Sequence, residues 1–169
     1  AQYPLAHDAH KQLEMVTLLA VAAGSRGMAG GQAIDLASVG KTLTLPELEL
    51  MHIHKTGALI RAAVMLGALC GELSDAKMAK LDHFAKCIGL AFQVVDDVLD
   101  AEASTATLGK TAGKDAEQNK PTYVSVLGVT QAKALAESLR QDAHAALASF
   151  DAAAQRLRAL ADFIVLRPF

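Results

Sequence analysis

The stretch MAKLDHFAKCIGLAFQVVDDVLD, from Met78 to Asp100, decides the fold. Its apolar residues recur every three or four positions, the spacing of one face of an α-helix: Met78, Leu81, Ala85, Ile88, Phe92, Val95 and Leu99. Three further apolar residues, Phe84, Ala91 and Val98, widen this face. A helix this apolar must be surrounded on most sides, so the stretch predicts a central, buried helix.

The rest of the chain is also typical of helices. It contains 34 alanines, while Phe, Trp and Tyr together make up 4% of the residues, a balance that favours close-packed helices over sheets. We predict a single all-α domain over residues 1–169. The first helix is expected from about residue 8 into the twenties, or as far as 36. The others are expected at about 45–71, 74–100, 121–127, 131–150 and 151–166, with a loop over 102–120. Thr44 and Glu47 form a capping box for the second helix, and Ser74 caps the third.

Four glycines interrupt the predicted first helix: Gly24, Gly27, Gly30 and Gly31. Each of them costs the helix about 1 kcal/mol relative to alanine. Their spacing of three or four residues places small residues on one face. Another helix or a ligand could therefore approach the backbone closely there.

Charge and hydropathy exclude several classes of protein. Sixteen Lys and Arg residues against 18 Asp and Glu give a net charge of −2, so no overall positive field attracts nucleic acid or an anionic membrane. The longest stretch without a charged residue, Pro121 to Ala132, has 12 residues, against the roughly 20 that a membrane-spanning helix needs. Cys70 and Cys87 lie in apolar, helix-like contexts that favour free, buried thiols, so we expect a reducing, cytoplasmic location.

Three carboxylates, Asp96, Asp97 and Asp100, lie at the predicted end of the central helix. At about 100° per residue, Asp96 and Asp100 share one side, behind Gly89 and Gln93, and Asp97 lies on an adjacent flank. Repulsion between like charges and the negative end of the helix dipole both oppose this placement. A divalent cation would relieve both penalties, and a site of few carboxylates with room for water and phosphate suits Mg²⁺. The alternative is a solvated acidic helix end.

Lysines near these carboxylates indicate an anionic ligand. Lys110, Lys114 and Lys120 lie in the predicted loop, with glycines as flexible points, an arrangement suited to a phosphate-bearing ligand. A solvated lysine loop is the alternative. Lys55 lies in an apolar helix, where a lysine is costly unless it meets an anion or extends to solvent. His52 and His54 are two residues apart and so lie on different sides of that helix, which makes a zinc pair there improbable.

Four segments of the chain match known motifs in order and spacing. They are GGQAID at residues 30–35, HIHKT at 52–56, FQVVDDVLD at 92–100, and GKTAGKD at 109–115 with KPTY at 120–123. Together they resemble the GGQxxD helix, the HxxKT-type segment, the second aspartate-rich motif and the GKxxGxD and KxTY stretch of the trans-polyprenyl diphosphate synthases. The resemblance covers essentially the whole chain. It implies an isoprenoid-synthase-type helical bundle around a central cavity.

The resemblance also implies roles for individual residues. Asp96 and Asp100 would hold a Mg²⁺ that bridges an allylic diphosphate, with Asp97 as a further ligand or water holder. Lys55 and Lys120, together with Asp96, would act in catalysis. The residues that would bind diphosphate, orient it or line the pocket are Gln32, Lys55, Thr56, Gln93, Lys110, Lys120 and Arg167.

The implied reaction is a head-to-tail condensation. Loss of diphosphate from dimethylallyl or geranyl diphosphate gives an allylic cation, isopentenyl diphosphate attacks it, and a proton leaves. Farnesyl diphosphate is the expected product, and a geranylgeranyl or longer-chain diphosphate is the alternative. The competing interpretations of the chain are a non-catalytic helical partner subunit, an alanine-rich interaction domain and a terpene cyclase.

One motif of the family has no match in the chain. Members carry an earlier DDxxD motif, followed by arginines, that binds further Mg²⁺ and isopentenyl diphosphate, whereas Asp96-Asp97 is the sole Asp-Asp pair here. We therefore expect residues 1–169 to be the C-terminal part of a longer synthase, without its N-terminal helices and inactive on its own. The family commonly forms homodimers, so the full-length protein is expected to be one.

Overall fold

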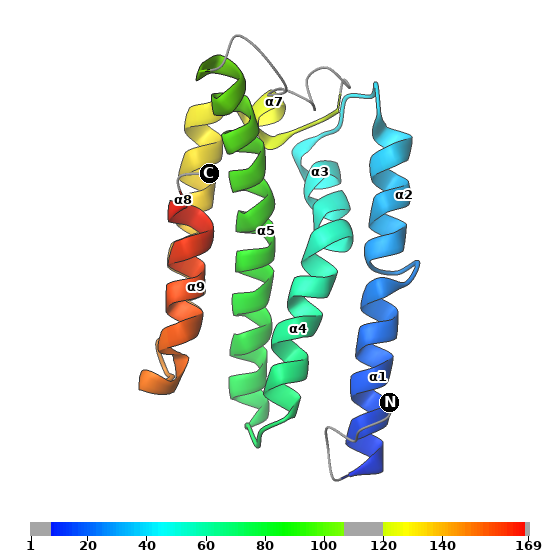
Figure 1. Cartoon of the computed structure of the whole chain (residues 1–169), viewed down its shortest axis with the longest axis vertical. Coiled ribbons are helices and arrows are strands. Elements are labelled where there is room, and N and C mark those ends of the chain that lie inside the picture. Colours follow the sequence, from blue (N-terminus) through cyan, green and yellow to red (C-terminus); the bar gives the residue numbers. More distant parts are fainter. Residues whose placement is uncertain (1–7, 107–119, 168–169) are drawn as a thin grey trace.

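The computed structural model describes residues 8–106 and 120–167, and the regular structure within them is helical (Figure 1). The first part of the chain forms α1 (Ala9–Ala23), α2 (Met28–Ser38), α3 (Leu45–His52), the π-helix η1 (Ile53–Gly57) and α4 (Ala58–Leu69). The second part forms α5 (Asp75–Ala106), α7 (Tyr123–Leu127), α8 (Val129–Ala146), the 3₁₀ helix η2 (Ala152–Ala154) and α9 (Gln155–Leu166). The prediction of an all-α fold is confirmed. No helix within the described ranges is long and apolar enough to cross a membrane.

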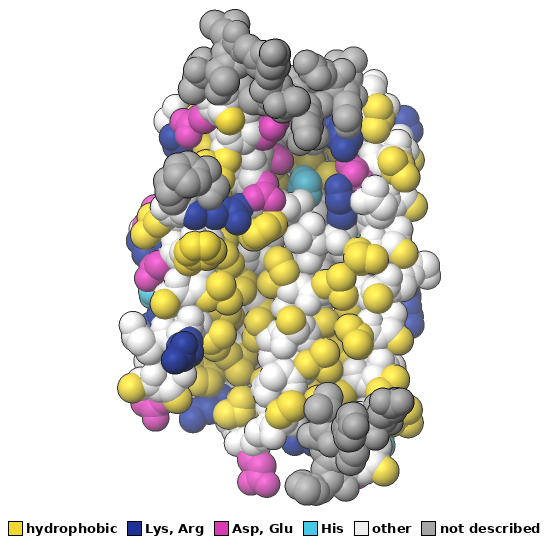
Figure 2. All heavy atoms as spheres, viewed as in Figure 1, with side chains coloured by type: hydrophobic (Ala, Val, Ile, Leu, Met, Phe, Trp, Pro, Cys, Tyr) yellow, Lys and Arg dark blue, Asp and Glu magenta, His cyan; other side chains and the backbone are white. Residues whose placement is uncertain are grey.

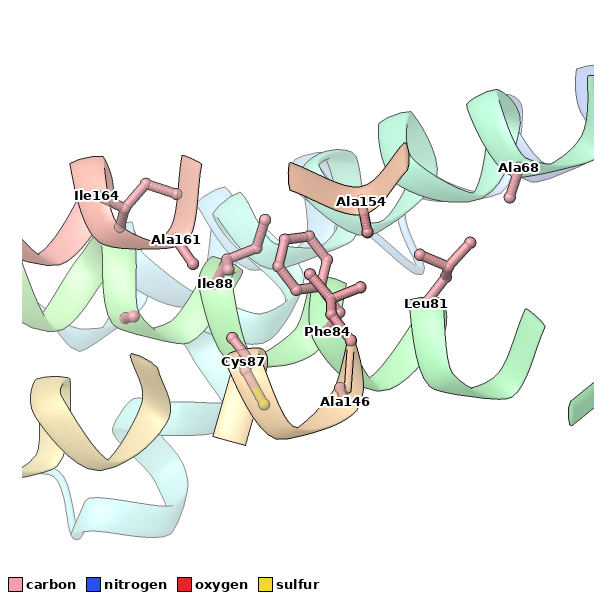
Figure 3. Packing of buried hydrophobic residues seen from close by; sticks show 12 residues of the cluster. Ala68, Leu81, Phe84, Cys87, Ile88, Ala146, Ala154, Ala161 and Ile164 are labelled. Atoms are coloured by element: carbon pink, nitrogen blue, oxygen red, sulfur yellow. The ribbon is translucent and has the colours of Figure 1, made fainter. Parts of the chain in front are cut away.

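Helix α5 is the centre of the bundle, as its apolar pattern predicts. Figure 3 shows Phe84 and Ile88 of α5 among residues of the surrounding helices, including Ile164 of α9. Farther along α5, Val94 packs with Leu48 of α3 in a second cluster. Complete burial of such a side chain stabilises the fold by about 1.5–3 kcal/mol. Because α5 contributes side chains to both clusters, it organises both halves of the core.

Helix α5 is longer than predicted. We expected it to end near Asp100 and a loop to follow from Glu102, but it continues to Ala106. Alanine and glutamate are strong helix formers even without an apolar face, and Glu102 forms an ion pair with Lys133 of α8 (2.6 Å). Asp96 therefore lies well inside the helix. The predicted penalty from the helix dipole is wrong for it, because that effect is confined to the last turn.

The first helix ends at Ala23, in the twenties as predicted, and the alternative of one continuous helix to Leu36 is wrong. The break lies between Ala23 and Met28, where Gly24 and Gly27 separate α1 from α2. At the break the chain folds so tightly that a Cβ on Gly27 would overlap the carbonyl of Ala22. Glycine removes that overlap, so its presence permits the break.

The predicted second helix begins as expected and contains an unexpected π-helix. The Thr44 amide donates a hydrogen bond to Glu47 (2.8 Å), which closes the capping box. After His52 the helix widens into η1 and then resumes as α4. Such π-helical turns insert a residue into an α-helix and are frequent at functional sites.

A charged network joins α8 to α9. Arg140 binds Glu137 (2.8 Å) and Asp162 (2.7 Å), and the Nε2 atom of His144 lies 2.7 Å from Asp162. Hydrogen bonds from Arg140 and Gln141 lower the pKa of Glu137 to about 2. The network fixes α9, which carries Arg167 at its end.

The two cysteines differ in exposure. Cys87 of α5 is buried, as predicted, but Cys70 is exposed. The prediction is wrong for Cys70, which lies just beyond the end of α4 at Leu69. Burial, and then the nearby charge of Asp142, raise the pKa of Cys87 to about 11.

We therefore expect an alkylating reagent to modify Cys70 and to leave Cys87 unmodified in the folded chain. At about pH 8, roughly one thousandth of Cys87 would be thiolate, the reactive form. Mass spectrometry after brief treatment with iodoacetamide should show one adduct, and two after unfolding. Fast modification of Cys87 in the folded chain would contradict the burial described here.

Candidate functional site

The predicted site residues of α5 lie in different surroundings. Asp96 forms an ion pair with Arg167, which follows α9, and its side chain is 42% exposed. Gln93, one turn earlier, donates a hydrogen bond from Nε2 to Oδ2 of Asp96 (3.3 Å). Asp100 lies one turn after Asp96 and is partly buried. The structure therefore brings Gln93 and Arg167 to Asp96, as expected for residues of one site.

Arg167 is held against α5 by a second contact. Its guanidinium carbon lies 4.5 Å from the centroid of the Phe92 ring, a distance at which a cation is attracted to an aromatic face. The side chain is 12% exposed, and its Nε atom is buried without a hydrogen-bond acceptor among the described residues. Desolvation raises the pKa of Asp96 above its usual value, although the charge and hydrogen bond of Arg167 act in the opposite direction.

Asp97 points elsewhere. It is buried, and its Oδ2 accepts a hydrogen bond from the backbone amide of Tyr123 (2.7 Å) at the start of α7. The Tyr123 ring is fully buried and stacks on His52 of α3, with 5.4 Å between the ring centroids. Asp97 thus joins α5 to the segment that begins at Lys120.

The three carboxylates predicted as metal ligands do not form one cluster among the residues that the structure describes. Within residues 8–106 and 120–167, no group of three or more His, Cys, Asp and Glu side chains could hold a metal ion. The cause is the helical turn of about 100° per residue, which directs Asp96 toward α9 and Asp97 toward α7. Asp97 thus contacts the start of α7 in this structure, and its role as a metal ligand or water holder stays a prediction.

Lys55 lies in η1 and meets an anion, as one of its two predicted alternatives requires. Its Nζ atom is 2.7 Å from Oδ2 of Asp35 in α2, and Asp35 is 4% exposed. The two helices can approach because Gly31 lies at the crossing, where a Cβ would overlap the backbone nitrogen of Lys55. This confirms the predicted close approach of another helix at the glycines.

Asp35 was not among the predicted site residues. Its position one turn after Gly31, on the same side of the helix, is a signal that could have identified it. Stacking of Tyr123 on His52 and the π-helix at Lys55 have no comparable signal in the local sequence.

The remaining predicted residues lie on several elements. Thr56 is partly buried in η1, whereas Gln32 of α2 is exposed. Lys120 is partly buried and, with Lys41, lines a cavity of about 670 Å³ between the segment before α3 and the start of α7. Lys110 and Lys114 lie outside the described residues.

The surface around these residues has two distinct regions. Figure 2 shows acidic, basic and histidine side chains gathered toward one end of the face, above an expanse of hydrophobic side chains. Asp96 and Asp100 offer oxygen ligands one turn apart, and both side chains are only partly buried. One or two carboxylates, with water and phosphate oxygens, are a ligand set that Mg²⁺ accepts. Asp96 and Asp100 therefore fit a Mg²⁺ ion whose other ligands are water or phosphate oxygens.

Comparison with known proteins agrees with this geometry. A model of the polyprenyl synthetase family matches residues 2–157. The farnesyl diphosphate synthase of Escherichia coli is 49% identical over 162 residues, which cover 92% of this chain and 54% of that enzyme. The chloroplastic geranylgeranyl pyrophosphate synthase of Catharanthus roseus is 46% identical over 157 residues, which cover 92% of this chain and 44% of that enzyme. The chain thus spans about half the length of the curated relatives it matches.

Solved structures show the same fold. An FPP/GFPP synthase from Zymomonas mobilis superposes with a TM-score of 0.82 at 37% identity, over 95% of this chain and 53% of that one. A geranyltransferase from Helicobacter pylori, complexed with magnesium and isoprenyl diphosphate, gives a TM-score of 0.74 at 29% identity, over 94% of this chain and 52% of that one.

Proposed function

The chain belongs to the polyprenyl synthetase family, and we propose on that premise that it supplies the diphosphate-binding end of a Mg²⁺-dependent prenyltransferase. The proposed reaction condenses isopentenyl diphosphate with an allylic diphosphate. The observation that carries the proposal is the pairing of Asp96 with Arg167 and of Lys55 with Asp35. Each pair holds a predicted site residue with a counter-ion from the chain itself. A magnesium–diphosphate ligand brings charges of both signs and can replace these counter-ions.

The proposed mechanism assigns each charged residue one task. Asp96 and Asp100 would hold Mg²⁺ from one side of α5, with Gln93 keeping Asp96 oriented. When bound, the metal would supply positive charge to balance the charge that grows on the departing diphosphate. Lys55 and Lys120 bind the diphosphate oxygens as point charges. Arg167, once released from Asp96, can donate its unused Nε proton to a phosphate oxygen.

The apolar face below the charged end suits the other half of the substrate. An allylic cation survives only where water is excluded. The hydrophobic side chains seen in Figure 2 offer an apolar surface next to the charged end. We propose that the isoprenoid chain of the substrate lies along this face, inside a central cavity.

We also propose which product the enzyme forms and which part of the enzyme residues 1–169 represent. Both farnesyl and geranylgeranyl synthases are similar to this chain, so farnesyl diphosphate is proposed and a longer diphosphate is the alternative. Because those relatives are about twice as long, residues 1–169 are proposed to form one all-helical C-terminal domain that does not elongate isoprenoids alone. A non-catalytic partner subunit would not need Lys55 and Asp96 at positions suited to binding diphosphate and a metal ion. Two free thiols support the proposed cytoplasmic location.

Magnesium should control ligand binding in the full-length polypeptide. We expect geranyl diphosphate to bind in the presence of Mg²⁺ and to lose at least about tenfold in affinity when EDTA removes it, or in a Lys55→Ala variant, because a charge-assisted contact is lost. Isothermal titration calorimetry measures both effects. The matched control is Lys133→Ala, whose lysine binds Glu102 on the outside of α5. Equal affinity with and without Mg²⁺ would contradict the proposal.

We further propose that the full-length protein is a homodimer through α1 and α2, which form one edge of the bundle (Figure 1). Both helices expose large apolar side chains outward: Leu13, Val16, Leu19, Val21, Met28, Ile34 and Leu36. A row of this kind is typical of a surface that another helix covers.

A Leu19→Asp variant is therefore expected to be monomeric, because a carboxylate would be buried without a partner at the interface. Sedimentation velocity measures the change. Leu160→Asp places the same charge on an exposed leucine of α9 and should leave the dimer intact. A Leu19→Asp protein that remains dimeric would exclude this edge as the interface.

A further inference from the structure

A second cavity lies apart from the charged end of the bundle. It has a volume of about 410 Å³ and lies between η1 and α4 on one side and α5 and α8 on the other. That volume is within the range of about 300–1,000 Å³ that small-molecule sites occupy. Its apolar lining comes from all four elements and includes Ile53, Ala58, Leu90 and Leu139.

This cavity is distinct from the site around Lys55. Four of its lining residues on this side, His54, Gly57, Ala58 and Arg61, follow the three- and four-residue spacing of one helix face, and Ile53 precedes them. Lys55, in contrast, reaches α2 and binds Asp35. The continuous helix formed by η1 and α4 therefore faces Asp35 of α2 with one side and the cavity with another.

Basic residues also belong to the lining of the cavity. Arg26, Arg61 and Lys86 all line the cavity. Asp82 binds both Arg61 and Lys86, the latter at 2.7 Å, whereas the guanidinium of Arg26 has no ion pair within the described ranges. Asp142 is the other carboxylate nearby, since its charge acts on Cys87, another lining residue.

The resulting charge is opposite to that of the whole protein. Three permanently charged cations and, among the described residues, no carboxylate line the cavity, in a chain with a net charge of −2. A concave apolar surface with a few basic groups at its edge matches a molecule that is apolar along most of its length and anionic at one end.

We propose that this cavity binds a small amphipathic anion, with its apolar chain along Ile53, Leu90 and Leu139 and its anionic head at Arg26 and Lys86. The head is a phosphate or a carboxylate, and the chain is a fatty or isoprenoid one. The site does not depend on Mg²⁺, because no Asp or Glu is among the described residues that line the cavity.

Calorimetry on the 169-residue chain in EDTA tests the site, with dodecyl phosphate below its micelle concentration as the probe. The chain should bind it, and an Arg26→Gln/Lys86→Gln variant should bind it about tenfold or more weakly. Both side chains are exposed, so the variant should fold normally. Lys80→Gln, an exposed lysine of the same helix that contacts Ser149, is the matched control and should bind like the unaltered chain.

Further arms locate the ligand and identify its head group. Dodecanol and inorganic phosphate should each fail to bind, because each lacks one half of the recognised molecule. If laurate binds as tightly as dodecyl phosphate, the site accepts anionic head groups in general. If dodecyl phosphate binds and laurate does not, the ligand is an isoprenoid phosphate or a related phosphate ester. Bound probe should also slow the alkylation of Cys87 at high pH. Equal affinity in the Arg26→Gln/Lys86→Gln variant, or displacement of the probe by geranyl diphosphate with Mg²⁺ at the Lys55 end, would overturn the proposal.

Discussion

An Asp96→Ala variant of the full-length polypeptide should lose at least about a hundredfold in turnover while keeping normal helix content. Removing one group that stabilises developing charge typically costs two to three orders of magnitude, and each tenfold corresponds to about 1.4 kcal/mol. The fold should persist because Asp96 lies in the interior of α5 with a side chain 42% exposed. Steady-state kinetics with geranyl and isopentenyl diphosphates and far-ultraviolet circular dichroism measure the two quantities.

Two comparisons sharpen this prediction. Glu102→Ala removes a carboxylate from the same helix that binds the outer Lys133, and it should change turnover by less than a few-fold. Asp97→Ala should instead lower stability, because the buried Tyr123 amide loses its acceptor, at about 1–3 kcal/mol. Unchanged turnover in the Asp96→Ala enzyme would remove this carboxylate from the mechanism.

A Gly31→Ala substitution should destabilise the chain, and Gly67→Ala should stabilise it. At Gly31 the new methyl group would overlap the backbone of Lys55, and backbone cannot move aside cheaply. Overpacking of this kind costs about 2–4 kcal/mol. Gly67 lies in α4, where a Cβ meets nothing within 4 Å. Alanine there should add about 0.5–1 kcal/mol through its better helix propensity.

Thermal unfolding followed by circular dichroism distinguishes these two outcomes. For a chain of this size, the Tm of Gly31→Ala should fall by about 5–15 °C, and that of Gly67→Ala should rise by about 1–4 °C. In the full-length enzyme, Gly31→Ala should also weaken diphosphate binding because it displaces Lys55. A Gly31→Ala chain as stable as the original would show that α2 does not cross η1 as closely as described.

Features of the fold that follow from local spacing could be predicted from the sequence. The apolar stripe from Met78 to Leu99 identified the buried centre of α5, and Thr44 with Glu47 identified the start of α3. Both depend on residues within one or two turns of each other, so the sequence contains the whole cause. The end of α5 was misplaced because a loss of apolar pattern does not end a helix of good helix formers.

Contacts between distant segments could not be predicted in the same way. Periodicity showed that Lys55 needed an anion or solvent, but only the crossing of α2 and η1 identifies Asp35 as its partner. Similarly, the helical turn separates Asp96 from Asp97, but only the packing of α7 and α9 shows what each one meets. The motif resemblance supplied the candidate residues, and the structure supplied their pairing.

The π-helix has a consequence for insertions and deletions in this chain. Residues Ile53–Gly57 hold one residue more than an ordinary helical path would need. Deleting Thr56 would restore an ordinary α-helical turn and leave the later side chains, such as that of Ala68 in the α5 core, close to their present directions, whereas winding all of these residues into an α-helix would rotate the later side chains by about 100°. The additional residue therefore changes the rotational register of the side chains within one continuous helix. Lys55 and the alanines of α4 thus each keep a direction that an uninterrupted helix could not give to both.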